Sequence, residues 1–192
     1  MDLETLTRLL EAADVRLVRF EIADVHGIAR SKSIPLKKLS DYGSRGLNFY
    51  GGMLKQDARG DDIPQDDVLH PPDFQMMPDW DTLTVLPYAP GEARIICDLF
   101  DVNGSPAMSD PRYAVRRIVH RYGEMGMIVR TGFELEFYLI DRTSGATAFS
   151  DRQICSSVRN NEAPDLRNAL LDALHPLGIE LSTYSVENAP GQ

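Results

Sequence analysis

The sequence has few cysteines and a deficit of basic residues, and each shortage excludes a class of function. Only two cysteines, Cys97 and Cys155, occur among 192 residues, and they form no C-x-x-C pair. A zinc knuckle or a dithiol redox motif is therefore not expected. Lys and Arg total 20 against 29 Asp and Glu, which gives a formal net charge of −9. Nucleic-acid binding depends on cations placed at phosphates, so this charge balance disfavours it.

Long apolar runs are also missing from the sequence. No stretch approaches the ~20 apolar residues of a membrane-spanning helix, so no membrane partner is expected. Residues 1–15 are acidic and amphipathic, whereas a secretory signal needs a basic start and an apolar block. We therefore expect a cytoplasmic protein, in which a disulfide would be unusual. The 43% hydrophobic and 26% charged residues are typical of a globular protein with a sizeable core.

The order of local patterns predicts an α+β protein in two parts. Residues 1–105 are mostly strand-forming, with a long Gly-, Pro- and Asp-rich loop over 51–79, and residues 106–192 begin a helix–strand–helix–strand unit. The predicted helices cover 2–13, 35–42, 110–125 and 164–176, and the predicted strands cover 15–22, 28–34, 82–87, 93–99, 127–140 and 179–187. In the third helix, the periodicity predicts a buried stripe of Val115, Ile118, Val119 and Tyr122.

Two glutamates on the strand predicted over 127–140 form the sharpest chemical feature. Alternate side chains of a strand share a face, so Phe133, Leu135 and Phe137 would form an apolar face. Glu134 and Glu136 would lie together on the other face, ~7 Å apart by the strand rise. Neighbouring carboxylates repel unless a cation lies between them. Oxygen ligands of this kind suit Mg²⁺ or Mn²⁺.

Other interpretations of these acids are open at this point. An E-x-E pattern is more often the exposed polar face of a half-buried sheet, and a glycosidase acid/base pair is a further reading. A third acid, Glu187, closes the strand predicted over 179–187 and by itself is a surface acid at a strand end. Strict alternation places Glu187 on the side of Ile179 and Leu181, so a bulge near Tyr184 is needed to turn it toward a polar site.

An ordered series of segments resembles the glutamine synthetase family. The segments are Asp24-Val25-His26-Gly27-Ile28-Ala29-Arg30 with Lys32 and Ile34-Pro35, Met77-Pro78-Asp79 through Leu86-Pro87, Ile96-Cys97-Asp98, Asp110-Pro111-Arg112, Gly132-x-Glu134-x-Glu136-Phe137, and Glu187-x-x-Pro190-Gly191-Gln192. Each segment is weak alone. Their order and spacing cover nearly the whole chain, and the set is specific.

The resemblance implies a β-grasp-like N-terminal domain over residues 1–105, followed by an incomplete glutamine synthetase-type catalytic α/β domain over 106–192. It implies that Glu134 binds the second of two divalent cations, Mg²⁺ or Mn²⁺, and that Glu136 and Glu187 bind the first. In this family, neighbouring subunits of a ring complete one another's active sites, so the parent protein is expected to be a homo-oligomer. The family's later histidine, nucleotide-binding residues and arginines are absent, so this chain alone is expected to be inactive.

The implied reaction is the ATP-dependent ligation of glutamate to an amine. ATP phosphorylates the side-chain carboxylate of glutamate, and the amine then displaces phosphate from the acyl phosphate. Family members that use ammonia carry aspartate in a Phe-Asp-Gly-Ser loop, where this chain has Phe49-Tyr50-Gly51-Gly52. Tyrosine supplies no negative charge at neutral pH, which favours a polyamine, alkylamine or aromatic amine over ammonia. A non-catalytic structural or binding relative on the same scaffold is the alternative.

Overall fold

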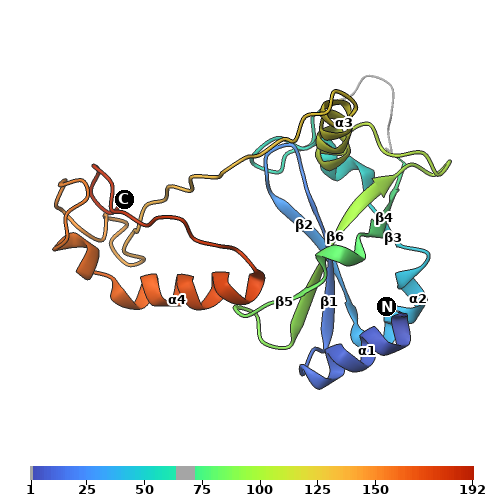
Figure 1. Cartoon of the computed structure of the whole chain (residues 1–192), viewed down its shortest axis with the longest axis horizontal. Helices are drawn as coiled ribbons and strands as arrows, with labels where there is room; N and C mark the ends of the chain where they lie inside the picture. The colour runs from blue at the N-terminus through green and yellow to red at the C-terminus, as the bar shows by residue number, and fades with distance from the viewer. Residues whose placement is uncertain (1, 64–71) are drawn as a thin grey trace. The chain divides into compact units, whose positions relative to one another are not determined.

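The structure is a computed structural model that describes residues 2–63 and 72–192 (Figure 1). Backbone contacts divide the chain into two compact units, Met1–Val129 and Arg130–Gln192, and each is described by itself. Among the described residues, none of the helices has the length and apolar character to cross a membrane. Part of the acidic loop predicted over 51–79, residues 64–71, lies outside the described residues.

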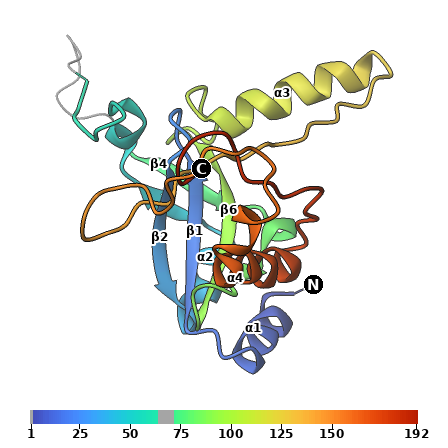
Figure 2. The same cartoon turned by 90° about the vertical axis from the view of Figure 1, so that its left-hand side faces the viewer.

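A curled mixed sheet forms the centre of the first unit. Its strands are β1 (Leu17–Ala23), β2 (Ala29–Pro35), β3 (Leu47–Phe49), β4 (Phe74–Pro78), β5 (Thr84–Val85) and β6 (Glu92–Phe100). The strand order is β2-β1-β6-β4-β3, and β5 also pairs with β6. Strands β1 and β6 run parallel and the other pairs are antiparallel. Figure 2 shows β2, β1 and β6 side by side.

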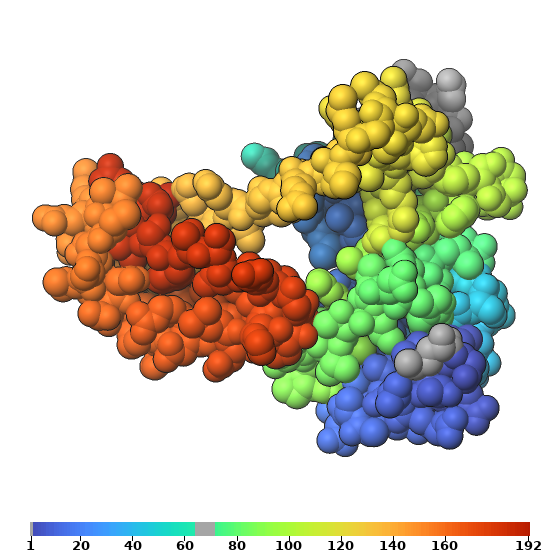
Figure 3. Space-filling view, in the orientation of Figure 1, coloured from blue at the N-terminus to red at the C-terminus, as the bar shows by residue number. Residues whose placement is uncertain are grey.

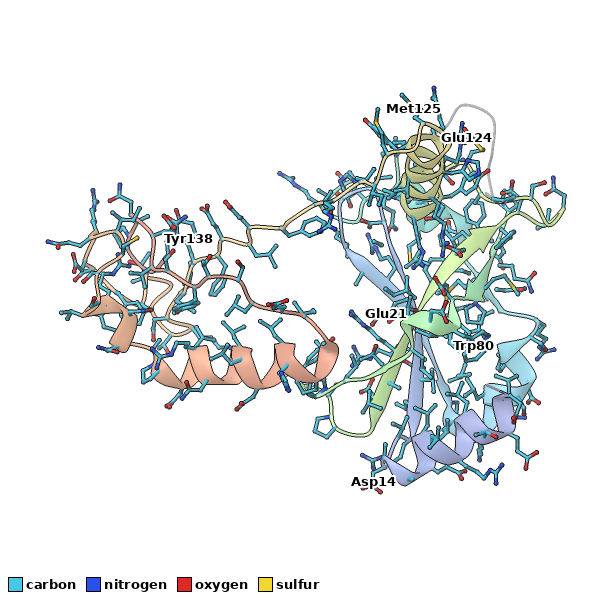
Figure 4. The ribbon with its side chains drawn as sticks, in the orientation of Figure 1. Asp14, Glu21, Trp80, Glu124, Met125 and Tyr138 are labelled. Carbon is cyan, nitrogen blue, oxygen red and sulfur yellow. The ribbon has the colours of Figure 1, made fainter. Side chains whose placement is uncertain are left out.

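One face of this sheet forms the hydrophobic core. Every second residue of β6 is buried, and so is every second residue of β1 in its interior, because successive side chains of a strand point to opposite faces. Helices α1 (Leu3–Ala12) and α2 (Leu39–Gly43) add Leu10 and Leu39 to the same cluster. Trp80, labelled in Figure 4, packs against this cluster and lies beside Gly43 of α2. The chain is therefore a mixed α and β protein, as the sequence predicts.

The two edge strands of the sheet meet through a lysine. Lys32 of β2 donates a hydrogen bond from Nζ to the backbone carbonyl of Asn48 in β3, at 2.5 Å. Because β2 and β3 stand at opposite ends of the strand order, this contact requires the sheet to curl. Lys32 lies opposite Phe20 in the β1–β2 register, on the face that carries the core.

Buried Asp24 organises the turn between β1 and β2. Its carboxylate accepts hydrogen bonds from the backbone amides of His26 and Ile28 and from Nε of Arg30, each at 2.9 Å. Burial opposes ionisation of Asp24, but the bonds from Ile28, Arg30 and His26 together outweigh it and lower the pKa of Asp24. Gly27 supplies the left-handed backbone conformation of the turn, with φ +76°.

Helix α3 (Pro111–Glu124) is attached to the sheet by polar contacts. The buried carboxylate of Asp110 caps the helix by accepting from the amide of Arg112 at 2.9 Å, and it also accepts from the amide of Leu99 in β6 at 3.0 Å. Ion pairs join the first turns of α3 to the sheet. Arg112 and Arg116 each contact Asp79, which follows β4, and Asp98 of β6. These contacts fix the start of α3.

The predicted buried stripe of α3 is wrong. Val115, Ile118, Val119 and Tyr122 are 59%, 55%, 47% and 43% exposed. Figure 3 shows α3 in yellow with an open outer surface. The periodicity identified an apolar face correctly, but no element among the described residues packs over it.

Strand β4 lies inside the segment that the sequence assigns to an irregular loop. Its sequence, Phe-Gln-Met-Met-Pro, has no β-branched residue and ends in proline, so local propensity does not reveal it. The strand forms because β6 and β3 provide partners on both sides, with Met76 opposite Leu99 and Leu47.

The second unit contains helix α4 (Pro164–Leu174) and two short 3₁₀ turns, Arg159–Asn161 and His175–Leu177. The strands predicted over 127–140 and 179–187 are wrong, because neither segment forms a strand. Within the described residues, the only ladder contact in this unit is an isolated bridge between Ile140 and Thr147. A strand needs a neighbouring strand to satisfy its backbone, and none is present here.

Both cysteines are free thiols. Cys97 is buried in β6, and burial raises the pKa of its thiol to about 12. Cys155 is exposed in the second unit.

The core assignment predicts that Phe20→Ala destabilises the first unit by about 3–5 kcal/mol, because the ring is fully buried. Urea unfolding followed by the fluorescence of Trp80, the single tryptophan, measures this. The matched control is Ile118→Ala on the open face of α3, which should change the free energy of unfolding by less than about 0.5 kcal/mol. Equal losses in the two variants would contradict the described packing.

The Asp24 turn predicts a pH-dependent contribution to stability. Because folding lowers the pKa of Asp24, its contribution is present above the ordinary value of about 3.9 and is lost as pH falls through the lower folded value. Asp24→Asn should cost about 1–3 kcal/mol at pH 7, and its difference from the parent should shrink as the pH falls below about 4. Urea midpoints at pH 7, 5 and 3 test this, and a pH-independent difference would refute the role of ionised Asp24.

Candidate functional site

The three glutamates singled out by sequence all lie in the second unit. Glu134 and Glu136 lie in an exposed segment over 130–139 that also carries Tyr138, labelled in Figure 4. Glu187 is partly buried in the segment that ends at Gln192. Because 130–139 is not a strand, the backbone does not impose the predicted alternation on Glu134 and Glu136. The apolar residues between them, Phe133 and Leu135, are 87% and 85% exposed.

Gln192 links Glu136 and Glu187, which are 51 positions apart. Its side-chain Nε2 donates to Oε2 of Glu136 at 2.7 Å, and its backbone carbonyl accepts from the amide of Glu187 at 3.2 Å. The carboxylate of Glu187 accepts from the hydroxyl of Ser185 at 3.4 Å. The structure therefore brings two of the three predicted acids to one turn.

The approach of the two segments depends on Gly191. The amide of Leu139 donates to the carbonyl of Gly191 at 2.7 Å, so the backbones are in direct contact. A Cβ atom at Gly191 would lie 2.7 Å from the carbonyl oxygen of Leu139, and φ is +77°. Both the conformation and the space exclude a larger residue at this position of the Pro-Gly-Gln motif.

Arg159 is bonded to the same turn, although no sequence motif predicts it as a site residue. Its side chain is buried, and its guanidinium donates to the carbonyl of Glu187 at 2.8 Å. Further bonds of 3.4 Å reach the carbonyls of Gln153, Ala189 and Gln192. The local sequence pattern does not predict this role, because three of its four partners are 28 to 33 positions away. The fourth partner, Gln153, is six positions away.

A complete cation site is not formed by these residues. Across residues 2–63 and 72–192, no group of three or more His, Cys, Asp or Glu is placed to hold a metal ion. The contacts through Gln192 join Glu136 and Glu187 and do not include Glu134.

Side-chain hydrogen bonds hold the acidic loop near residue 57. The carboxylate of Asp57 accepts from the amides of Arg59 and Asp61 at 2.8 and 3.0 Å. The bonds from Asp61 and Arg59 lower the pKa of Asp57. This arrangement caps a tight turn and satisfies the loop's own backbone.

Tyr50 stands where the family resemblance predicts that the amine is selected. It stands at the start of the 3₁₀ turn Gly51–Lys55 in the first unit and is 46% exposed. Its ring lies over Gly52, so closely that a Cβ atom on Gly52 would collide with the ring and its hydroxyl. Glycine at position 52 thus makes room for the tyrosine.

The comparisons with known proteins agree on one family. The family model described as "Glutamine synthetase, catalytic domain" matches residues 108–192. The chain is 31% identical over 198 residues to the glutamine synthetase of Mycobacterium tuberculosis, an alignment that covers 98% of this chain. The chain belongs to the glutamine synthetase family. It is also 29% identical over 181 residues to lengsin of Canis lupus familiaris, which covers 93% of this chain.

Two solved structures share the fold of this chain. Those described as "GmaS/ADP complex-Conformation 1" and "Apo GmaS without ligand" both match with a TM-score of 0.81 and cover 97% of this chain, at 21% and 22% identity. The chain spans 42% and 43% of those two chains, 42% of the mycobacterial enzyme and 32% of the lengsin. The predicted membership in the glutamine synthetase family is confirmed.

The arrangement of the acids predicts only weak binding of Mg²⁺ or Mn²⁺ by the 192-residue chain. Two carboxylates joined through Gln192 provide fewer oxygen ligands than a tight site needs. Isothermal titration with MnCl₂ should therefore show no saturable stoichiometric step, and Glu136→Gln should leave the trace unchanged. A tight site with one or two ions per chain, lost in Glu136→Gln, would contradict this.

Proposed function

We propose that this chain is part of an ATP- and metal-dependent ligase that joins the side-chain carboxylate of glutamate to an amine. The observation that carries the proposal is the convergence of Glu136 and Glu187 on Gln192, within the residues that match the catalytic domain. In this proposal residues 1–105 form a β-grasp-like domain, and residues 106–192 begin the catalytic domain of a cytoplasmic homo-oligomer.

The proposed ligands of Mg²⁺ or Mn²⁺ are Glu134, Glu136 and Glu187. In this proposal the three carboxylates come together around a divalent cation, which removes their mutual repulsion. The bond from Gln192 orients one oxygen of Glu136, and the backbone bond between Glu187 and Gln192 sets the start of the same turn. Further ligands, together with the nucleotide and glutamate contacts, belong to the remainder of the parent enzyme in this proposal.

The proposed reaction has two steps. A carboxylate oxygen of glutamate attacks the γ-phosphorus of ATP, which releases ADP and leaves an acyl phosphate. The amine nitrogen then attacks the acyl carbon, phosphate departs, and the nitrogen loses a proton to give the amide. A bound metal ion would supply the positive charge that neutralises the transferring phosphoryl group.

Tyr50 supports a larger amine rather than ammonia as the second substrate. A phenol ring offers an apolar face and a neutral hydroxyl, whereas an aspartate offers the negative charge that suits ammonium. The ring is exposed and fits over Gly52, so the loop is built for an aromatic side chain at this position.

The proposal predicts the amine preference of the full-length enzyme. Phosphate release with ATP, glutamate and Mg²⁺ should be faster with an alkylamine, polyamine or aromatic amine than with ammonium. Tyr50→Asp should shift the ratio of kcat/KM values toward ammonium by about tenfold, which corresponds to about 1.4 kcal/mol. Tyr50→Phe is the matched control and should keep the original preference, and equal rates with ammonium and larger amines in the parent would overturn it.

A non-catalytic relative on the same scaffold is the second candidate. The observation that favours it is that the acids in the described residues do not complete a cation site. Absence of phosphate release with every amine, together with absence of Mn²⁺ binding by the full-length protein, would establish this candidate.

A further inference from the structure

We propose that Arg159 is a positioning residue, which holds the turn from Glu187 to Gln192 and thereby keeps Glu136 and Glu187 together. Its functional meaning rests on the proposed function, but the positioning itself stands on the geometry of the second unit. Arg159 is 3% exposed, and its hydrogen bonds go to backbone oxygens rather than to the carboxylate of Glu136 or Glu187.

The guanidinium contacts both ends of the turn. Nη1 donates to the carbonyl of Glu187 at 2.8 Å, and Nη2 donates to the carbonyls of Ala189 and Gln192 at 3.4 Å. The turn has few backbone bonds of its own: Gln192 donates to Ala189 at 3.1 Å, and Glu187 donates to Gln192 at 3.2 Å. A buried donor that reaches three carbonyls therefore supplies much of what fixes this backbone.

The charge of Arg159 is unusual for its setting. Buried charges in proteins are normally paired with an opposite charge. Across the described parts of the chain no Asp or Glu side chain forms an ion pair with Arg159, and its Nε has no hydrogen-bond partner. Backbone oxygens, that of the final residue Gln192 included, are thus its main stabilising partners, and most of them belong to this turn.

Arginine suits this position better than lysine does. Its planar group presents five donors in a fixed fork, so one side chain bonds carbonyls that lie in different directions. A lysine ammonium keeps the charge but not this geometry. The effect passes to Glu136 through Gln192, whose side chain donates to the carboxylate, and to Leu139 through Gly191.

Amide hydrogen exchange of the 192-residue chain, resolved by NMR, tests the positioning directly. Arg159→Met should speed exchange at Glu187, Gln192 and Leu139 by about tenfold or more, because the turn opens locally. Arg159→Lys should give an intermediate effect. Helix α4 is the internal reference, and its exchange should stay unchanged in a folded variant. Arg152→Met, at an exposed residue of the same unit, is the matched control and should change nothing.

Paramagnetic broadening by MnCl₂ in the same samples separates this inference from the proposed function. Broadening at Glu136 and Glu187 in the parent chain that weakens in Arg159→Met supports both. Faster exchange in Arg159→Met without broadening in the parent supports the positioning and counts against the metal site. Unchanged exchange in Arg159→Met overturns the positioning whatever Mn²⁺ does. Should Arg159→Met unfold α4, the Arg159→Lys exchange pattern decides, and parent-like exchange there overturns the inference.

Discussion

Hydrogen bonding between neighbouring strands is the constraint on which the structure of this chain depends. In the first unit β6 has partners along both edges, and its side chains alternate between the core and the other face of the sheet as a result. In the second unit the segment over 130–139 has strand-like residues and no neighbour. Its apolar side chains are consequently exposed, and its acids are placed by side-chain contacts instead of by a ladder.

Elements with strong local signals could be predicted from the sequence. Asp2 caps α1, Asp110 caps α3, and Pro164 opens α4, and each of these signals acts within one helical turn. The open face of α3 and the hidden strand β4 could not be predicted, because both depend on what lies beside them. Periodicity states that a face is apolar, but it does not state that anything covers it.

The candidate site, too, could be predicted from the sequence only in part. Glu134, Glu136 and Glu187 stood out through spacing and through an ordered set of short motifs that together point to one family. The contacts that join two of them run through Gln192, 56 positions from Glu136, and the supporting Arg159 lies in a short 3₁₀ turn, Arg159–Asn161. Such long-range contacts leave no mark on local composition, so only the folded chain reveals them.

Lys32, which joins β2 to β3, affects whether strands of other copies can pair with the edges of this sheet. An open margin of a sheet is a template on which strands of other copies can add and propagate into aggregates. A strand adding beside this contact meets the exposed charge of Lys32, and lysines on edge strands are one of the means by which proteins discourage such addition. The three-residue length of β3 also offers few backbone groups for another strand to pair with.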